Sequence, residues 1–286
     1  MRLYAALATL VLAVPIASAD KKRDERPRDE RTQVRAETPV AKPPPPSSVT
    51  LPQGTIAGHL ALELSVSAGN VLAPASVAPD ISYGVTDHFT VAAISSGSAL
   101  TGFRGGAGAG LCVTGTDGNC RTPYNAAGVE GLYALTRGPA ALAFNAGVLW
   151  TSFEPTVHTD IKLGFKLKMS EANVYAWFAP NVWLALDDRF DRVVPHEHQL
   201  WLPVSLWVKV IPELAFGVGT GVKGPLKGFA DRMSIPIGVL AQYSFSPRFS
   251  VGTSFVFGKI LGGGDVMDPG IDARVVQIWV NVTGGG

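Results

Sequence analysis

The sequence predicts an all-β protein, an antiparallel up-and-down transmembrane β-barrel of about 12 strands. The clearest sign is the alternation over residues 161–169, where odd positions are apolar and even positions hold Lys162, Gly164, Lys166 and Lys168. Alternate side chains of a strand point to opposite faces, so one face is apolar and the other is basic. The apolar face suits either the core of a soluble sandwich or the lipid around a barrel.

Strand length and composition favour the barrel. Most candidate strands have ten or more residues, whereas soluble strands average about 5–6 and a tilted membrane strand needs about 9–11. Charged residues make up 16% of the 286-residue chain, below the usual quarter of a soluble domain, and 47% of residues are hydrophobic. Beyond the N-terminal segment, no apolar run reaches the roughly 20 residues of a membrane helix. The net charge of +1 gives no electrostatic reason to expect nucleic acid as a partner.

The N-terminal region divides into two predicted segments. Residues 1–19 have the form of a secretory signal peptide, with Arg2 before an apolar stretch and Ala17-Ser18-Ala19 as the cleavage site. A retained membrane anchor is the alternative, for which the apolar stretch is short. Residues 20–54 carry mixed charge and a proline run without any aromatic residue, so a disordered segment is expected. This segment either tethers the barrel to a partner or is a solvated leader.

The barrel is expected over residues 55–286. The candidate strands are 55–66, 75–85, 89–96, 123–136, 140–151, 160–169, 174–186, 199–210, 213–223, 233–244, 248–258 and 273–283. In 199–210, leucine and valine at even positions oppose Trp201, Trp207 and Lys209, and the even face is the candidate lipid face. The faces of 89–96, 123–136, 140–151 and 273–283 are weaker and open to reversal.

Short and long connections alternate along this series. Tight polar turns are predicted at 86–88, 137–139, 170–173, 211–212 and 245–247. The other connections are longer, including the one between the first two strands, and the longest spans about 97–122. A barrel with one turn rim and one loop rim produces this alternation, and a Greek-key sandwich does not. An even number of strands places both ends of the barrel at the turn rim.

Two segments read as hairpins around tight polar turns, ISYGVTDHFTV (81–91) and YSFSPRFSVG (243–252). With the strand pattern over roughly 55–283, they resemble the β-barrel proteins of Gram-negative outer membranes. The resemblance implies a barrel in the outer membrane with the 20–54 tail in the periplasm. It also implies contact with membrane lipid and lipopolysaccharide, and insertion by the barrel assembly machinery. The terminal WVNVTGGG departs from the aromatic ending common in this class, which bears on the assembly signal more than on the fold. No oligomeric state is predicted.

Cys112 and Cys120 bracket VTGTDGN within the longest connection. Two cysteines this close in an exported chain, with glycine between them, predict a disulfide. A metal or redox pair would need partner histidines or a C-x-x-C spacing, and the sequence has neither there.

The connection 187–198 combines acidic residues with histidine. Its members are Asp187, Asp188, Asp191, His196 and His198. His196, His198 and Asp191 could form a surface metal site, but a solvated outer loop is favoured, so no metal or other cofactor is predicted. The acids would also suit a hydrolase at the rim, but the lipid faces hold no Ser–His pair. No catalytic residue is predicted, and a hydrolase is the weakest hypothesis.

The inward faces of three neighbouring strands predict a wall of lysine and aromatic side chains. Its members are Lys162, Lys166, Lys168, Tyr175, Trp177, Asn181, Trp183, Trp201, Trp207 and Lys209. Lysines attract anions, and ring faces can stack on a solute. In the alternative interpretation, tryptophans fill a modest bore against the glycine-rich strands opposite. Buried lysines need water or partners, for which the candidates are Glu63, Asp80, Glu130 and Glu213.

Two hypotheses of different classes follow. In the first, the barrel is a small channel or binding pore for small solutes, anions among them, with a continuous wet lumen past Lys166. In the second, side chains plug the lumen, and the barrel is a structural or adhesive surface protein that works through its outer loops and tail. The fold by itself does not decide between them.

Overall fold

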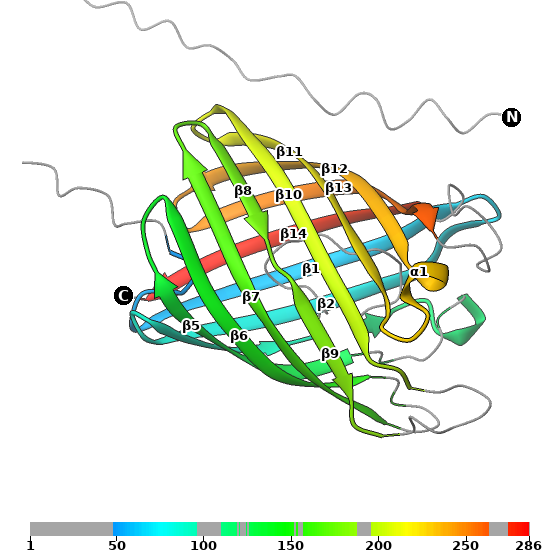
Figure 1. Cartoon of the computed structure of the whole chain (residues 1–286). Coiled ribbons are helices and arrows are strands. Elements are labelled where there is room, and N and C mark those ends of the chain that lie inside the picture. Colours follow the sequence, from blue (N-terminus) through cyan, green and yellow to red (C-terminus); the bar gives the residue numbers. More distant parts are fainter. Residues whose placement is uncertain are drawn as a thin grey trace, which may run out of the picture. The chain divides into compact units, whose positions relative to one another are not determined.

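A closed antiparallel barrel with twelve strand positions in its wall forms the body of the protein (Figure 1). The structure is a computed structural model that describes residues 48–95, 110–118, 120, 124, 126–151, 153, 157–187, 196–262 and 274–285. β1 pairs with both β2 and β14, and this closes the ring. The predicted all-β fold is confirmed. The predicted signal peptide and most of the predicted disordered segment lie outside the described residues.

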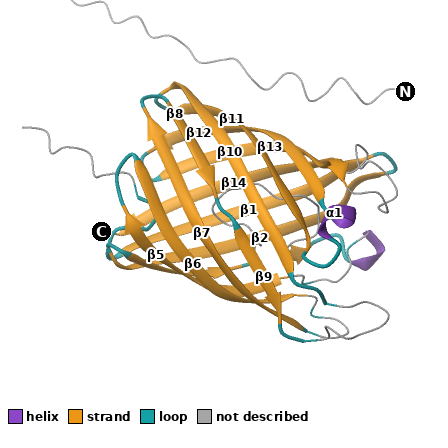
Figure 2. Ribbon diagram, viewed as in Figure 1, coloured by secondary structure: helices purple, strands orange, loops and turns teal. Residues whose placement is uncertain are grey.

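Nearly all described residues of the barrel belong to strands, as Figure 2 shows. The elements are β1 (Thr55–Ser67), β2 (Asn70–Thr86), β3 (Phe89–Ile94), β4 (Leu111–Cys112), η1 (Thr116–Gly118), β5 (Ala126–Thr136), β6 (Ala140–Thr151), β7 (His158–Glu171), β8 (Val174–Phe178), β9 (Asn181–Ala185), β10 (Gln199–Ile211), β11 (Leu214–Pro225), α1 (Phe229–Arg232), β12 (Ser234–Ser246), β13 (Phe249–Gly262) and β14 (Arg274–Gly285). In the part of the chain that is described, no helix is long and apolar enough to cross a membrane.

The connection between the first two strands differs from the prediction of a longer link. Only Ala68 and Gly69 separate β1 from β2, and Ser67 pairs with Asn70, so the hairpin continues beyond the expected ends of both strands. Gly69 has φ +81°, a left-handed conformation that glycine adopts without strain in a tight turn. The small residues around Pro74 are typical of a loop, yet they continue β2.

The predicted strand 174–186 is divided into β8 and β9. The break falls at Pro180, which has no N–H to donate to the ladder. Across the break, the N–H of Ala179 donates to the carbonyl of Pro203 at 3.1 Å. β8 and β9 therefore share one wall position between β7 and β10, and the expected inward residues stay on one face.

In the described part of the long connection predicted at about 97–122, Leu111–Cys112 form the short strand β4. β4 pairs antiparallel with β2, with Cys112 opposite Ser76. Cys112 and Cys120 form the predicted disulfide.

One end of the barrel, the turn rim, gathers the tight connections β2–β3, β5–β6, β7–β8, β10–β11 and β12–β13 (Figure 1). The start of β1 and the end of β14 lie there too. The segment before β1 is bound to this rim: Thr50 Oγ1 donates to the carbonyl of Asp87 at 2.9 Å, and the N–H of Leu51 donates to Thr90 Oγ1 at 2.8 Å. The opposite end, the loop rim, carries the β1–β2 turn, α1 and the longer connections.

The outside of the barrel is apolar, as the alternation predicts. In β10, Val204, Leu206 and Val208 are exposed on the outer face, while Ser205 and Trp207 are buried on the inner face. Aromatic side chains are exposed on the outer face toward the turn rim. They are Tyr83, Tyr133, Tyr243, Phe245 and Phe249. An apolar belt with an aromatic girdle at its edge is the surface of a transmembrane barrel.

Candidate binding site in the barrel interior

A buried charge cluster occupies the middle of the lumen. Glu130 of β5 forms ion pairs with Lys162 and Lys166 of β7, one through each carboxylate oxygen. Glu130 and Lys162 are each 2% exposed, and Lys166 is 3% exposed. Glu130 is one of the four acidic residues that the sequence offers as partners for buried lysines.

The register places these side chains together although β6 separates their strands. Glu130 pairs with Gly147 of β6, and Gly147 pairs with Lys162. Because Gly147 has no side chain, Glu130 and Lys162 can meet above it. A Cβ at Gly147 would lie 2.5 Å from the carbonyl oxygen of Val129 and 3.1 Å from Glu130 Cα.

Amide side chains extend the polar layer around the lumen. Asn145 Nδ2 donates to Asn181 Oδ1 at 2.9 Å, crossing β7 above Gly164 in the same manner. On the opposite wall, Gln277 Nε2 of β14 donates to Glu63 Oε2 of β1 at 2.6 Å. These hydrogen bonds hold the layer in one arrangement, since each buried polar group that lost its partner would carry a desolvation cost.

An aromatic layer lies beside this polar layer. Trp207 of β10 and Trp279 of β14 are buried with Leu240, and Tyr175 and Trp177 pack against them. Trp207 lies against Gly217 of the next strand, where a Cβ would approach its ring to 2.7 Å. Trp207 thus covers Gly217, its cross-strand neighbour in β11, and the interpretation in which tryptophans fill the bore stays a prediction. Lys166, past which the channel hypothesis places a wet lumen, is 3% exposed in this arrangement.

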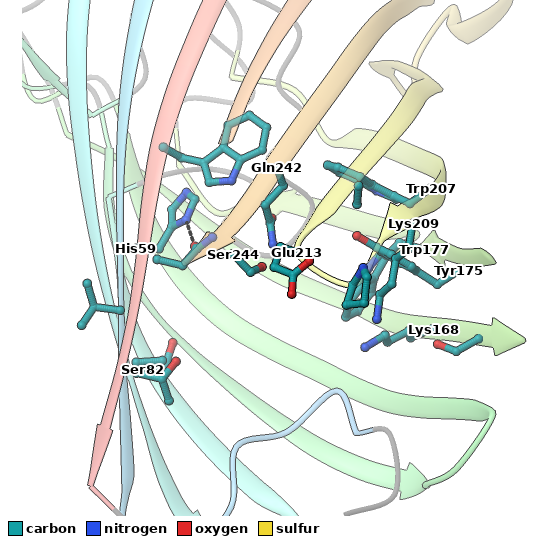
Figure 3. Close-up of a pocket in the computed structure, with 18 of the residues that line it drawn as sticks. His59, Ser82, Lys168, Tyr175, Trp177, Trp207, Lys209, Glu213, Gln242 and Ser244 are labelled. Atoms are coloured by element: carbon teal, nitrogen blue, oxygen red, sulfur yellow. Dashed lines mark hydrogen bonds between the residues drawn. The ribbon is translucent and has the colours of Figure 1, made fainter. Parts of the chain in front are cut away.

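A cavity of about 500 Å³ lies between the aromatic layer and the turn rim (Figure 3). We call it the vestibule. Lys168, Tyr175, Trp177 and Lys209 form one wall, and His59 faces them from β1. The other polar lining side chains are Asp80, Ser82, Ser170, Glu213, Gln242, Ser244, Asn281 and Thr283. Residues that are far apart in the sequence thus line the same cavity.

The ammonium groups of two lysines lie near the ring of Tyr175 in the vestibule. Lys168 Nζ lies 5.8 Å from the centroid of the Tyr175 ring, and Lys209 Nζ lies 6.0 Å from it. Lys168 Nζ also lies 5.3 Å from the Trp177 ring. Among the described residues neither ammonium forms an ion pair. Two cations beside ring faces make a surface suited to an anion, especially a planar one.

Four further predicted residues are Trp183, Trp201, Asp80 and Glu213, of which Asp80 and Glu213 line the vestibule. Trp183 of β9 and Trp201 of β10 have ring centroids 6.1 Å apart, and their buried indole N–H groups have no hydrogen-bond partner among the described residues. Asp80 accepts a hydrogen bond from the N–H of Ser95 at 2.7 Å. Glu213 is exposed at the turn rim, away from the central cluster.

Sequence reasoning missed several inward residues. Trp279 and Gln277 belong to the last strand, whose faces the sequence left open. Asn145 belongs to a strand with the same ambiguity. The strand pattern does carry a signal for Asn145, because this residue shares one face of the strand with Ala143 and Gly147, and Phe144 lies on the other face.

The closed ring, apolar exterior and polar interior define a transmembrane β-barrel of the outer-membrane type. No protein family and no curated protein matches the sequence. Two solved structures share the fold. A KdgM porin has 7% identity and a TM-score of 0.50, over 79% of this chain and 98% of its own. An outer-membrane channel from Pseudomonas putida F1 has 14% identity and a TM-score of 0.50, over 82% of this chain and 97% of its own. The likeness shows the fold alone, and this fold supports an outer-membrane location.

Proposed function

We propose that this protein is a narrow outer-membrane channel that binds small anionic solutes in the vestibule. The observation that carries the proposal is the placement of Lys168 and Lys209 around the Tyr175 ring, with no ion-pair partner for either lysine in the described part of the chain. A carboxylate or phosphate can accept from both ammonium groups. An aromatic solute can also contact the half-buried rings of Tyr175 and Trp177, which line the vestibule.

Passage beyond the vestibule requires the central cluster to rearrange. Lys162 and Lys166 are held by Glu130, and an anion that reaches them can pair with one lysine while Glu130 stays paired with the other. Such sharing leaves neither the lysines nor Glu130 as an isolated buried charge, which would be costly. In this scheme the vestibule selects solutes by charge, and the cluster limits their rate of passage.

The proposal includes the surroundings of the barrel. Its apolar belt contacts membrane lipid, with lipopolysaccharide in the outer leaflet, and the barrel assembly machinery inserts the chain. The turn rim and the N-terminal tail face the periplasm, so the vestibule opens to that side.

Single-channel conductance in a planar bilayer tests the proposal. The refolded protein should show small, steady currents whose reversal potential in a KCl gradient reports anion preference. Lys168→Glu with Lys209→Glu should shift the reversal potential toward cation preference, because both charges in the vestibule change sign. Lys227→Glu is the matched control, since Lys227 is exposed beside α1 at the loop rim. Equal reversal potentials in both variants would refute the vestibule as the selective site.

The second candidate function is a plugged surface barrel. The observation in its favour is the burial of Lys162, Lys166 and Glu130 together with the aromatic layer, which fills the middle of the lumen. A folded barrel that inserts into the bilayer but carries no current would favour this function. Its outer loops and tail would then be the parts to examine for partners.

A further inference from the structure

Three side chains from separate segments converge at the loop rim. His158 begins β7, Asp187 follows β9, and His196 precedes β10. One ligand atom from each residue lies within 4.8 Å of the others. Asp187 Oδ1 is 2.8 Å from His196 Nδ1 and 3.4 Å from His158 Nδ1. The two imidazole rings have centroids 4.5 Å apart.

A second set of contacts fixes these groups from behind. His196 Nε2 lies 3.1 Å from Asp160 Oδ1, so the ring is anchored by its far nitrogen while Nδ1 faces Asp187. The N–H of Thr159 donates to Asp187 Oδ2 at 2.7 Å, which leaves Oδ1 directed at the histidines. A carboxylate on the far nitrogen of a histidine is the usual support of a metal-binding imidazole, because it sets the tautomer and the orientation of the ring.

We infer that His158, Asp187 and His196 bind a divalent transition metal at the loop rim, with Zn²⁺ as the best fit. Two imidazoles and one carboxylate are a ligand set that Zn²⁺ accepts, with a further position left for water. Mg²⁺ and Ca²⁺ prefer sites made of oxygen ligands. The metal would join the start of β7 to both ends of the β9–β10 connection.

This set differs from the one that the sequence suggests. His198 belongs to the backbone contacts of the rim, since its Nδ1 accepts from the N–H of Ala185 at 3.0 Å. Asp191 lies outside the described residues. His158 stands on another connection, just before the expected strand 160–169, so the sequence pattern does not place it with His196.

Calorimetric titration with Zn²⁺ alone tests the inference. Untagged full-length protein, folded in detergent micelles and freed of metal by a chelator, should bind one Zn²⁺ per chain. His158→Ala and Asp187→Asn should each weaken binding more than about 100-fold, because each removes a ligand. Asp160→Asn should weaken it about 10–100-fold, as expected for a group that orients a ligand. His88→Ala, on the β2–β3 turn at the opposite rim, is the matched control and should bind as the wild type does.

Two results would overturn the site. One is a wild-type barrel that takes up no Zn²⁺. The other is a folded His158→Ala variant with wild-type affinity. Should the variants fail to fold, X-ray absorption at the zinc edge of the wild type must still show two imidazoles among nitrogen and oxygen ligands. A spectrum without them rejects the assignment. The vestibule lies at the other rim, so this outcome is independent of channel activity.

Discussion

Glu130 and Lys162 form an ion pair across β6, the strand that lies between their own strands β5 and β7. Gly147 occupies the position between them in the register, so the pair passes over a site without a side chain. A charge cluster in the middle of this barrel therefore depends on one glycine as much as on the charged residues.

Replacing the shared carboxylate should destabilise the barrel strongly. Glu130→Gln removes the carboxylate that pairs with both Lys162 and Lys166, and breaking a buried pair in this way costs about 3–5 kcal/mol. Urea unfolding in micelles, followed by tryptophan fluorescence, measures the loss. The control is Glu197→Gln, which breaks the pair with Arg232. That arginine side chain is 46% exposed, so the control should cost less than about 1 kcal/mol. Equal losses would contradict a buried cluster.

A methyl group added at position 147 should destabilise the same cluster by steric contact with its backbone. In Gly147→Ala the new Cβ meets the Val129 carbonyl and the Glu130 backbone, so the strands must shift, at a cost of about 1–3 kcal/mol. Gly58→Ala is the matched control, because a Cβ there has no neighbour within 4 Å. Its free energy of unfolding should stay unchanged or rise by up to about 1 kcal/mol. If both variants unfold at the same urea concentration, the backbone of Val129 and Glu130 does not approach Gly147 closely.

Parity along a strand made much of this interior predictable. Lys162, Lys166 and Lys168 share a face in any strand, and the apolar residues between them leave only one direction for the lipid. The pairing of Lys162 with Glu130 was not predictable to the same degree. It depends on the register of β6 against two neighbours, and alternation alone does not set register.

The sequence also could not divide the lysines by role. Lys168 is two residues from Lys166 on the same face, yet one lines the vestibule and the other is buried. The difference lies in their partners, because Lys166 pairs with Glu130 whereas Lys168 lies beside the rings of Tyr175 and Trp177. The residues of the proposed metal site could not be grouped from the sequence for a similar reason, because His158 and His196 belong to different connections.

Removing the ring of Tyr175 should weaken binding of an aromatic anion. Benzoate in the vestibule would lose the stacking surface between Lys168 and Lys209, so Tyr175→Leu should raise its Kd about 2–30-fold. Tyr175→Phe keeps the ring and should keep the affinity. Quenching of tryptophan fluorescence during titration measures both, and acetate serves as the anion without a ring. Wild-type benzoate affinity in Tyr175→Leu would exclude the ring from the site.

An arginine on the outer face should distinguish lipid from water around the barrel. Leu206 lies near the middle of β10 and is 53% exposed, whereas Val71 is 66% exposed beside the β1–β2 turn, beyond the loop rim. In a bilayer Leu206→Arg should cost about 2–4 kcal/mol because its charge enters the hydrocarbon, and Val71→Arg should cost about 0–1 kcal/mol. Both substitutions replace an exposed apolar side chain by arginine, so in water each would change the free energy of unfolding by less than about 0.5 kcal/mol. Urea unfolding from lipid vesicles measures the difference. A larger loss of unfolding free energy for Leu206→Arg than for Val71→Arg would place the apolar belt in the membrane. Equal small losses in the two variants would mean that water surrounds the belt.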